Sequence, residues 1–155
     1  MGVGCGCLRL SGAWAATQDE PTSLEFVAVA QSEAAEVMSR LAMTAYYHAG
    51  PTENRLGAGH VVPIGEGWVD GSPLDHMLVR LPYLWGPQLE HCPVSGRHVQ
   101  VLWLIPIYRI ENDFRRLRGQ EALEQRFEER SLDYLNPFRP PVLSPDDLGD
   151  DSCET

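Results

Sequence analysis

The sequence lacks lysine, and its acidic residues outnumber its basic ones. All twelve basic side chains are arginine, and 22 acidic residues give a formal charge of −10 at pH 7. This balance disfavours nonspecific nucleic-acid binding, because such binding requires an excess of basic side chains against phosphate. The sequence also lacks any run of about 18 consecutive apolar residues, so no membrane-spanning helix and no membrane partner are predicted.

Cysteine is scarce and unevenly placed. Cys5, Cys7, Cys92 and Cys153 do not spread through the chain as a disulfide framework would, and their spacing is not that of a zinc finger. The N-terminus lacks a basic segment followed by an apolar core, because Arg9 interrupts the apolar stretch. The sequence therefore predicts a cytoplasmic protein with reduced thiols.

Motifs for catalysis are also missing. The sequence has no Gly-x-Ser-x-Gly element and no phosphate-binding loop, and its five histidines do not stand at the short fixed spacings of metal ligands. We therefore expect no cofactor, no metal and no enzymatic activity. One alternative remains open, a metal-dependent or cysteine hydrolase whose site is assembled across strands from His60, Asp75, His76 and Cys92.

Hydrophobic periodicity predicts the order of the elements. Apolar residues at helical spacing predict an amphipathic helix over 32–48, which ends at Gly50 and Pro51. Strands are predicted over 60–64, 75–81 and 97–107, and two further helices over 111–117 and 120–130. A helix, then strands, then helices favour an α+β fold, in which a mostly antiparallel sheet packs against helices.

Composition divides the chain into three parts. Residues 1–23 are rich in Gly and Ala without periodicity, and we predict a disordered lead. Residues 24–139 are predicted to form a single domain. Residues 140–155 combine prolines with an acidic run and are predicted to be a disordered tail.

The most apolar run, residues 101–107, predicts a central strand. Both of its faces are apolar, so both should be covered by other elements. Pro106 has no N–H to donate, so we expect strand pairing to end there. Glu111 should lie in the first turn of the next helix, where its charge suits the helix dipole.

Aromatic and polar side chains gather in two predicted loops. Trp and Tyr bury large areas at small entropic cost, and they often form the centres of protein interfaces. The alternative is that the two loop tryptophans fold back to cover the sheet. The predicted partner-binding residues are Trp68, Asp70, Ser72, Tyr83 and Trp85 of the loops, together with His60 and His76.

Several motifs follow one another between about residues 25 and 140. In chain order they are Leu41-Ala42, Tyr46-Tyr47, Gly59-His60-Val61, residues 72–79, Pro82-Tyr83, residues 96–107, Glu111, residues 119–123 and residues 136–139. This ordered set resembles the suppressor of fused domain family over essentially the whole predicted domain.

The resemblance implies a protein-binding domain of α/β or α+β type without enzymatic activity. In animals the domain is half of a Hedgehog-pathway regulator that holds a transcription factor through a short added strand. Bacterial members occur alone or near toxin genes and are thought to act as immunity proteins, and this short chain is closer to them. Gly59 stands where the animal domain has an acidic residue before the histidine.

The expected partner is therefore a protein, with a toxin as the leading hypothesis. The acidity of the chain would suit a basic toxin such as a nuclease, because opposite charge raises association rates and specificity. A third hypothesis, a structural or oligomerisation module, requires Trp103 to lie on an exposed face of the sheet.

Overall fold

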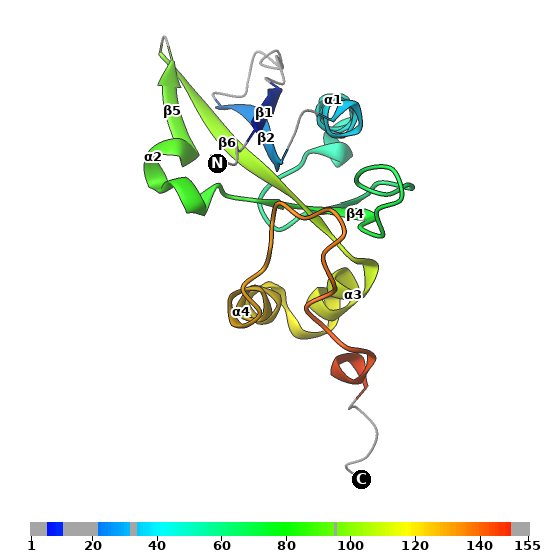
Figure 1. Cartoon of the computed structure of the whole chain (residues 1–155). Coiled ribbons are helices and arrows are strands. Elements are labelled where there is room, and N and C mark those ends of the chain that lie inside the picture. The colour runs from blue at the N-terminus through cyan, green and yellow to red at the C-terminus, as the bar shows by residue number, and fades with distance from the viewer. Residues whose placement is uncertain (1–5, 11–21, 32–33, 95, 150–155) are drawn as a thin grey trace, which may run out of the picture.

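A mixed sheet of six strands lies between helices on its two faces (Figure 1). The computed structural model describes residues 6–10, 22–31, 34–94 and 96–149. Its strands are β1 (Gly6–Leu10), β2 (Thr22–Ala30), β3 (Val61–Pro63), β4 (His76–Arg80), β5 (His91–Val94) and β6 (Arg97–Ile107). Its helices are α1 (Ala35–Ala49), α2 (Pro87–Glu90), α3 (Arg109–Arg118) and α4 (Gln120–Glu129), with single 3-10 turns η1 (Thr52–Asn54), η2 (Tyr83–Trp85) and η3 (Pro145–Leu148).

The sheet is mostly antiparallel. The strand order is β1-β2-β6-β4-β3, and β5 pairs with the first half of β6. Only the pairing of β2 with β6 is parallel among the five pairings of the described strands. The α+β prediction with a single domain is confirmed. The predicted strands and helices correspond to β3, β4, β6, α1, α3 and α4, whereas β1, β2, β5 and α2 were not predicted.

β6 is the central strand, and both of its faces are buried. Leu102 and Leu104 pack in the core on the side of α1, while Val101, Trp103 and Ile105 pack in the core on the side of α3 and α4. Each of these side chains is at most 1% exposed. The prediction for the two faces is confirmed. The hypothesis of an oligomerisation module required Trp103 to lie on an exposed face of the sheet, and its burial contradicts that requirement.

The pairing of β2 with β6 ends at Val27 opposite Trp103, although both strands continue. In an antiparallel pair of strands, residues alternate between those whose N–H and C=O groups bond to the partner strand and those whose groups point away from it. This alternation in the β4–β6 pair determines which peptide groups of β6 face β2. Val79 of β4 exchanges its backbone hydrogen bonds with residues on the β3 side. Its partner on β6, Leu104, therefore turns its peptide groups away from β4 and toward β2, and so does Pro106 two residues later.

Pro106 itself cannot pair with β2, for two reasons. It has no N–H to donate, and its carbonyl accepts a hydrogen bond of 3.2 Å from Arg139 Nη2. On the other side, pairing with β4 continues through Pro106 to Ile107. The prediction that pairing ends at Pro106 is wrong, because pairing with β2 ends three residues before it and pairing with β4 continues past it.

A buried ion pair joins Arg139, in the segment after α4, to Glu111 in the first turn of α3. Glu111 is 0% exposed and Arg139 is 3% exposed, and two hydrogen bonds of 2.7 and 2.8 Å join them. The Glu111 carboxylate also accepts hydrogen bonds from the backbone N–H groups of Tyr108 and Val142. Glu111 lies in the first turn of α3, as predicted, and caps that helix.

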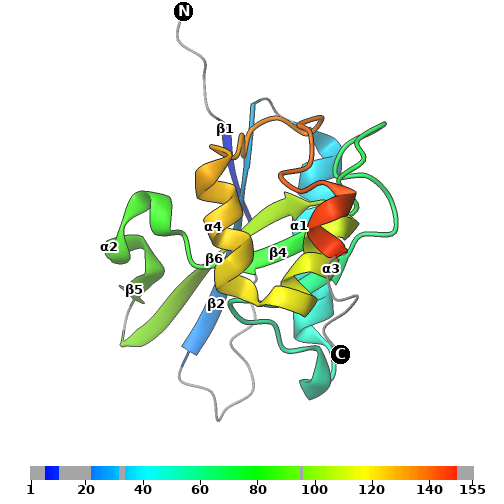
Figure 2. The ribbon, with the colours of Figure 1, turned by 90° about the horizontal axis from the view of Figure 1, so that it is seen from below.

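The predicted limits of the domain differ from the structure at both ends. β1 lies within the predicted lead and pairs antiparallel with β2. Val142 and Leu143 lie within the predicted tail, yet they are buried in the core beside α3 and α4. Figure 2 shows this final segment turning back from α4 toward α3 and ending in η3. The rest of the predicted lead and tail lies outside the described residues.

No helix that the structure describes combines the length and the apolar character needed to cross a bilayer.

Candidate functional site

Three consecutive apolar side chains stay exposed on η2. Tyr83 is 42%, Leu84 is 53% and Trp85 is 43% exposed. The turn is short because Pro82 precedes it and Gly86, with a φ of 78°, follows it. We call these three residues the aromatic ridge. The sequence predicted Tyr83 and Trp85 as contact residues and missed Leu84, which was signalled only by its place between them.

A buried tryptophan supports the aromatic ridge from below. The centroid of the Trp103 ring lies 5.6 Å from that of Tyr83 and 5.3 Å from that of Trp85, and both pairs of rings pack edge to face. The centroid of the Tyr134 ring lies 4.9 Å from that of Trp103. Such edge-to-face contacts between aromatic rings are favourable. The hydroxyls of Tyr83 and Tyr134 share a hydrogen bond of 2.7 Å. The ridge is therefore held in place before any partner arrives, which lowers the entropic cost of binding.

The environment of Tyr83 shifts its ionisation. Partial burial of the phenol raises its pKa above the ordinary value of 10.0, and the hydrogen bond to Tyr134 raises it further. Because the folded state keeps the proton that the unfolded chain releases near pH 10, the stability linked to Tyr83 is present below pH 10 and lost as the pH rises above it.

This linkage predicts a difference between the wild type and Tyr83→Phe. Between about pH 9 and pH 11 the wild type should lose more unfolding free energy than the variant, measured by urea denaturation at each pH. Tyr108 also has a raised pKa through burial, but it is present in both proteins and cancels from the comparison. An equal loss of unfolding free energy in the wild type and the variant would show that ionisation of Tyr83 does not cause this pH dependence.

The second predicted loop is fixed to the core. Trp68 is 3% exposed and packs in the core beside α1. Ser72 is 8% exposed, and its Oγ donates a hydrogen bond of 2.5 Å to the carbonyl of Pro137. Gly67 lies so close to the Ser72 carbonyl that a Cβ would stand 2.1 Å from its oxygen. Trp68 thus covers the sheet, as the alternative prediction stated, while Asp70 is exposed.

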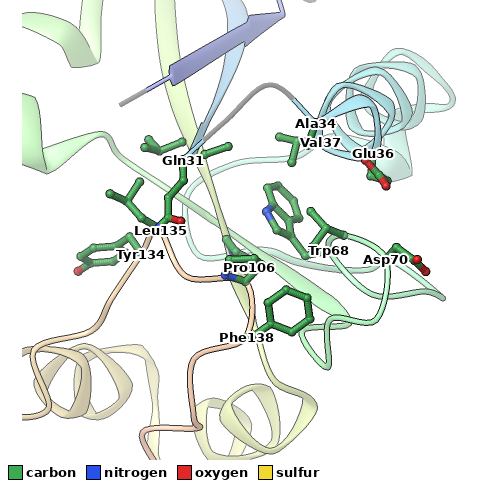
Figure 3. A pocket seen from close by; sticks show the side chains of 14 residues that line it. Gln31, Ala34, Glu36, Val37, Trp68, Asp70, Pro106, Tyr134, Leu135 and Phe138 are labelled. Atoms are coloured by element: carbon green, nitrogen blue, oxygen red, sulfur yellow. The ribbon is translucent and has the colours of Figure 1, made fainter. Parts of the chain in front are cut away.

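A pocket of about 290 Å³ opens beside Trp68, where β2 and β6 part (Figure 3). We call it the Trp68 pocket. Its apolar walls come from the end of β2, the start of α1, the loop, β6 and the segment after α4. They include Val29, Val37, Trp68, Pro106 and Leu135, with Tyr134 and Phe138 from the same final segment. Because Tyr134 also contacts Trp103, the pocket and the aromatic ridge share one supporting side chain.

The sequence did not identify the contributions of Tyr134, Phe138 and Glu36 to this region. They lie on α1 and after α4, far along the chain from the two loops. The exposure of Phe138, at 57%, is the kind of feature that only the fold can reveal. No local pattern in the sequence signals that these residues come together.

His60 lies at a different surface. Its exposed ring accepts a hydrogen bond of 3.2 Å at Nδ1 from the backbone of Gly57, just before β3. β3 is the last strand of the described sheet order, and a groove of about 470 Å³ runs beside it. Met43 and Tyr47 of α1 line the groove together with His60. His60 therefore does not meet the aromatic ridge.

The four residues of the hydrolase alternative are not brought to one site. His76 Nδ1 and Asp75 Oδ1 lie 2.7 Å apart at the start of β4, where His76 stands opposite Ile107 of β6. Cys92 lies on β5 opposite Val99, eight residues earlier along β6, which is about 26 Å at a rise of ~3.3 Å per residue. Within the described ranges, no group of three His, Cys, Asp or Glu side chains could hold a metal ion.

Comparison with known proteins identifies the family. The family model for suppressor of fused protein (SUFU) matches residues 3–140. The chain belongs to the suppressor of fused family. The resemblance of its motifs to that family is confirmed, and no curated protein sequence matches the chain.

Solved structures of suppressor of fused proteins share this fold. A SUFU homolog from Neisseria gonorrhoeae is 32% identical with a TM-score of 0.68, over 78% of this chain and 64% of that chain. The Sufu-Fu complex shows 17% identity and a TM-score of 0.64, over 86% of this chain and 66% of that chain. Drosophila Suppressor of Fused shows 16% identity and a TM-score of 0.60, over 81% of this chain and 33% of that chain. The chain thus spans less than two thirds of the length of each of these proteins.

The suppressor of fused motifs of this chain fall mainly in its scaffold. Residues 96–107 include the whole of β6, and Glu111 with Arg139 forms the buried ion pair. Gly59-His60-Val61 leads into β3. Of the motif residues, Tyr83 belongs to the aromatic ridge, so the motifs explain the fold better than they locate a binding surface.

Proposed function

We propose that this suppressor of fused domain binds a protein partner through the aromatic ridge and that the partner is a toxin, which the domain neutralises. The observation that carries the proposal is a row of three exposed apolar side chains on a rigid support. Each is 42–53% exposed, and the two aromatic members stand on the buried Trp103 ring. Large aromatic side chains in fixed positions are typical centres of binding energy in protein interfaces.

The family supports the choice of a protein as the partner. A related Sufu protein has been solved in the Sufu-Fu complex, so a protein of this fold is found with another protein. The proposal includes a cytoplasmic location and the absence of enzymatic activity, both of which rest on the composition and motifs of the sequence. The groove beside β3 and His60 is the alternative contact surface.

The test compares a ridge variant with a matched exposed residue elsewhere. Leu84→Asp should weaken partner binding at least about thirtyfold, which corresponds to ~2 kcal/mol at an interface centre. Leu117→Asp on α3 is the control, because Leu117 is 65% exposed and lies outside the ridge. His60→Ala reports on the alternative groove. Circular dichroism checks that all three variants keep the fold.

The partner is first identified by affinity capture with the immobilised chain, and binding is then measured by calorimetry with the purified partner. The partner should stop cell growth when expressed alone and permit growth when expressed with this chain. A partner that binds Leu84→Asp as tightly as the wild type would contradict the ridge assignment. A partner that is harmless alone would contradict the toxin assignment.

A further inference from the structure

We propose that the Trp68 pocket receives an arginine side chain of the partner, whose stem packs against Trp68 and whose guanidinium meets Glu36 and Asp70. This inference rests on the proposed function, because it concerns the protein that the domain binds. It adds a second contact to the aromatic ridge and specifies the chemistry of that contact.

The size and walls of the pocket fit one long side chain. Its volume of about 290 Å³ lies at the small end of ligand-binding pockets, which suits a single side chain better than a larger molecule. Val37 and Pro106 provide apolar walls beside the Trp68 indole. Trp68 Nε1 donates no hydrogen bond to any residue that the structure describes. The aliphatic stem of arginine can lie along such walls while its charged end stays near water.

The charge at one end of the pocket selects a cation. Glu36 of α1 and Asp70 of the loop lie beyond Trp68 at the same end (Figure 3). Neither carboxylate forms an ion pair or hydrogen bond with the described part of the chain, and no basic side chain lines the pocket. Arg40 is one helical turn from Glu36, but its Nη2 is bound to Glu66 Oε2 at 3.1 Å and to the Gly67 carbonyl at 3.0 Å. The two carboxylates are therefore available to a cation from outside.

Arginine fits this arrangement better than lysine. Its planar guanidinium carries five N–H donors and can bond two carboxylates at once, whereas an ammonium acts as a point charge. A guanidinium can also stack on an indole, which is the strongest of the aromatic partners for cations. Arginine is further enriched among the residues that contribute most to protein interfaces.

The experiment uses two peptides of nearly the same shape, one charged and one neutral. Acetyl-Gly-Arg-Gly-amide is compared with acetyl-Gly-citrulline-Gly-amide, in which the guanidinium is replaced by a neutral urea of the same shape. Binding to the full chain is followed by NMR through the indole N–H of Trp68, which is assigned with Trp68→Phe. The arginine peptide should shift this signal and bind about fivefold more tightly than the citrulline peptide, as expected for a partly exposed charge contact.

Variants of the carboxylates locate the contact. Asp70→Asn and Glu36→Gln should each weaken the arginine peptide about threefold, as expected for loss of one exposed charge contact. Glu128→Gln on α4 is the matched control, because Glu128 is exposed and remote from the pocket, and it should have no effect. Raising the salt concentration should reduce the advantage of the arginine peptide.

Several results would overturn the inference. The first is equal affinity of the chain for the two peptides, and the second is a loss of affinity with Glu128→Gln as large as with the pocket variants. The third is the absence of any shift of the Trp68 indole N–H signal on addition of the arginine peptide. The fourth is a shift of that signal with protein concentration when no peptide is present, which would indicate that a second copy of the chain occupies the pocket. Leu84→Asp should bind the arginine peptide as the wild type does. Failure of the pocket and failure of the aromatic ridge are therefore distinguishable.

Discussion

Replacing Arg139 with alanine is expected to lower the unfolding free energy by about 3–5 kcal/mol, because the change leaves the carboxylate of Glu111 buried without its cation. Glu111 is 0% exposed, so its carboxylate is out of contact with bulk water. The variant also loses the hydrogen bond to the Pro106 carbonyl. The final segment, which carries Val142 and Leu143 into the core, should detach first.

Urea denaturation of the variant and the wild type measures this loss. The control is Arg126→Ala, which removes ion pairs to Glu129 and Asp147 at a partly exposed site and should cost less than about 1 kcal/mol. The double variant Glu111→Gln with Arg139→Met should lose less than the sum of the two single changes, because it leaves no lone buried charge. A loss for Arg139→Ala no larger than that of the control would show that the buried pair contributes little to folding.

Replacing Trp103 with alanine is the second change with a large expected effect. Trp103 is 1% exposed in the middle of β6, and a Trp→Ala change at a buried site costs about 3–5 kcal/mol. The indole also supports Tyr83, Trp85 and Tyr134, so its loss removes the platform under the aromatic ridge. The variant should therefore lose partner affinity as well as stability.

Trp85→Ala separates these two consequences. Trp85 is 43% exposed, so its removal should cost much less stability than that of Trp103 while it still impairs the ridge. Thermal unfolding measures the stability of each variant, and near-ultraviolet circular dichroism reports the packing of the remaining rings. If both variants lost the same stability, Trp103 would not be the support of the cluster.

The sequence predicted the parts of the fold that depend on local pattern. β6 has the predicted bounds, and α3 and α4 differ from prediction by one or two residues, because apolar periodicity and Gly119 mark them clearly. β2 was missed because its pairing with both β1 and β6 depends on distant segments. The buried Val142 and Leu143 were missed because prolines and acidic residues surround them, and composition does not show the ion pair that holds them.

The candidate site was predictable only in part, for a related reason. Loop aromatics were recognised as a group, but whether each one faces the core or water depends on what packs beside it. Trp68 packs beside α1 and is buried, whereas Trp85 packs edge to face with the Trp103 ring and stays half exposed. The Trp68 pocket is assembled from segments more than 100 residues apart, from β2 to the stretch after α4, and no local pattern links them.

Because of Pro106, we expect the opening between β2 and β6 to persist when the residues around it are substituted. Most pockets depend on the sizes of the side chains around them, and one larger side chain can fill them. Here the wall of the opening includes Pro106, which has no N–H to donate to β2 and whose carbonyl is already bound to Arg139. Residues on the rim, such as Glu36, Asp70 and Phe138, can therefore be exchanged to fit different partners while the opening between the strands remains.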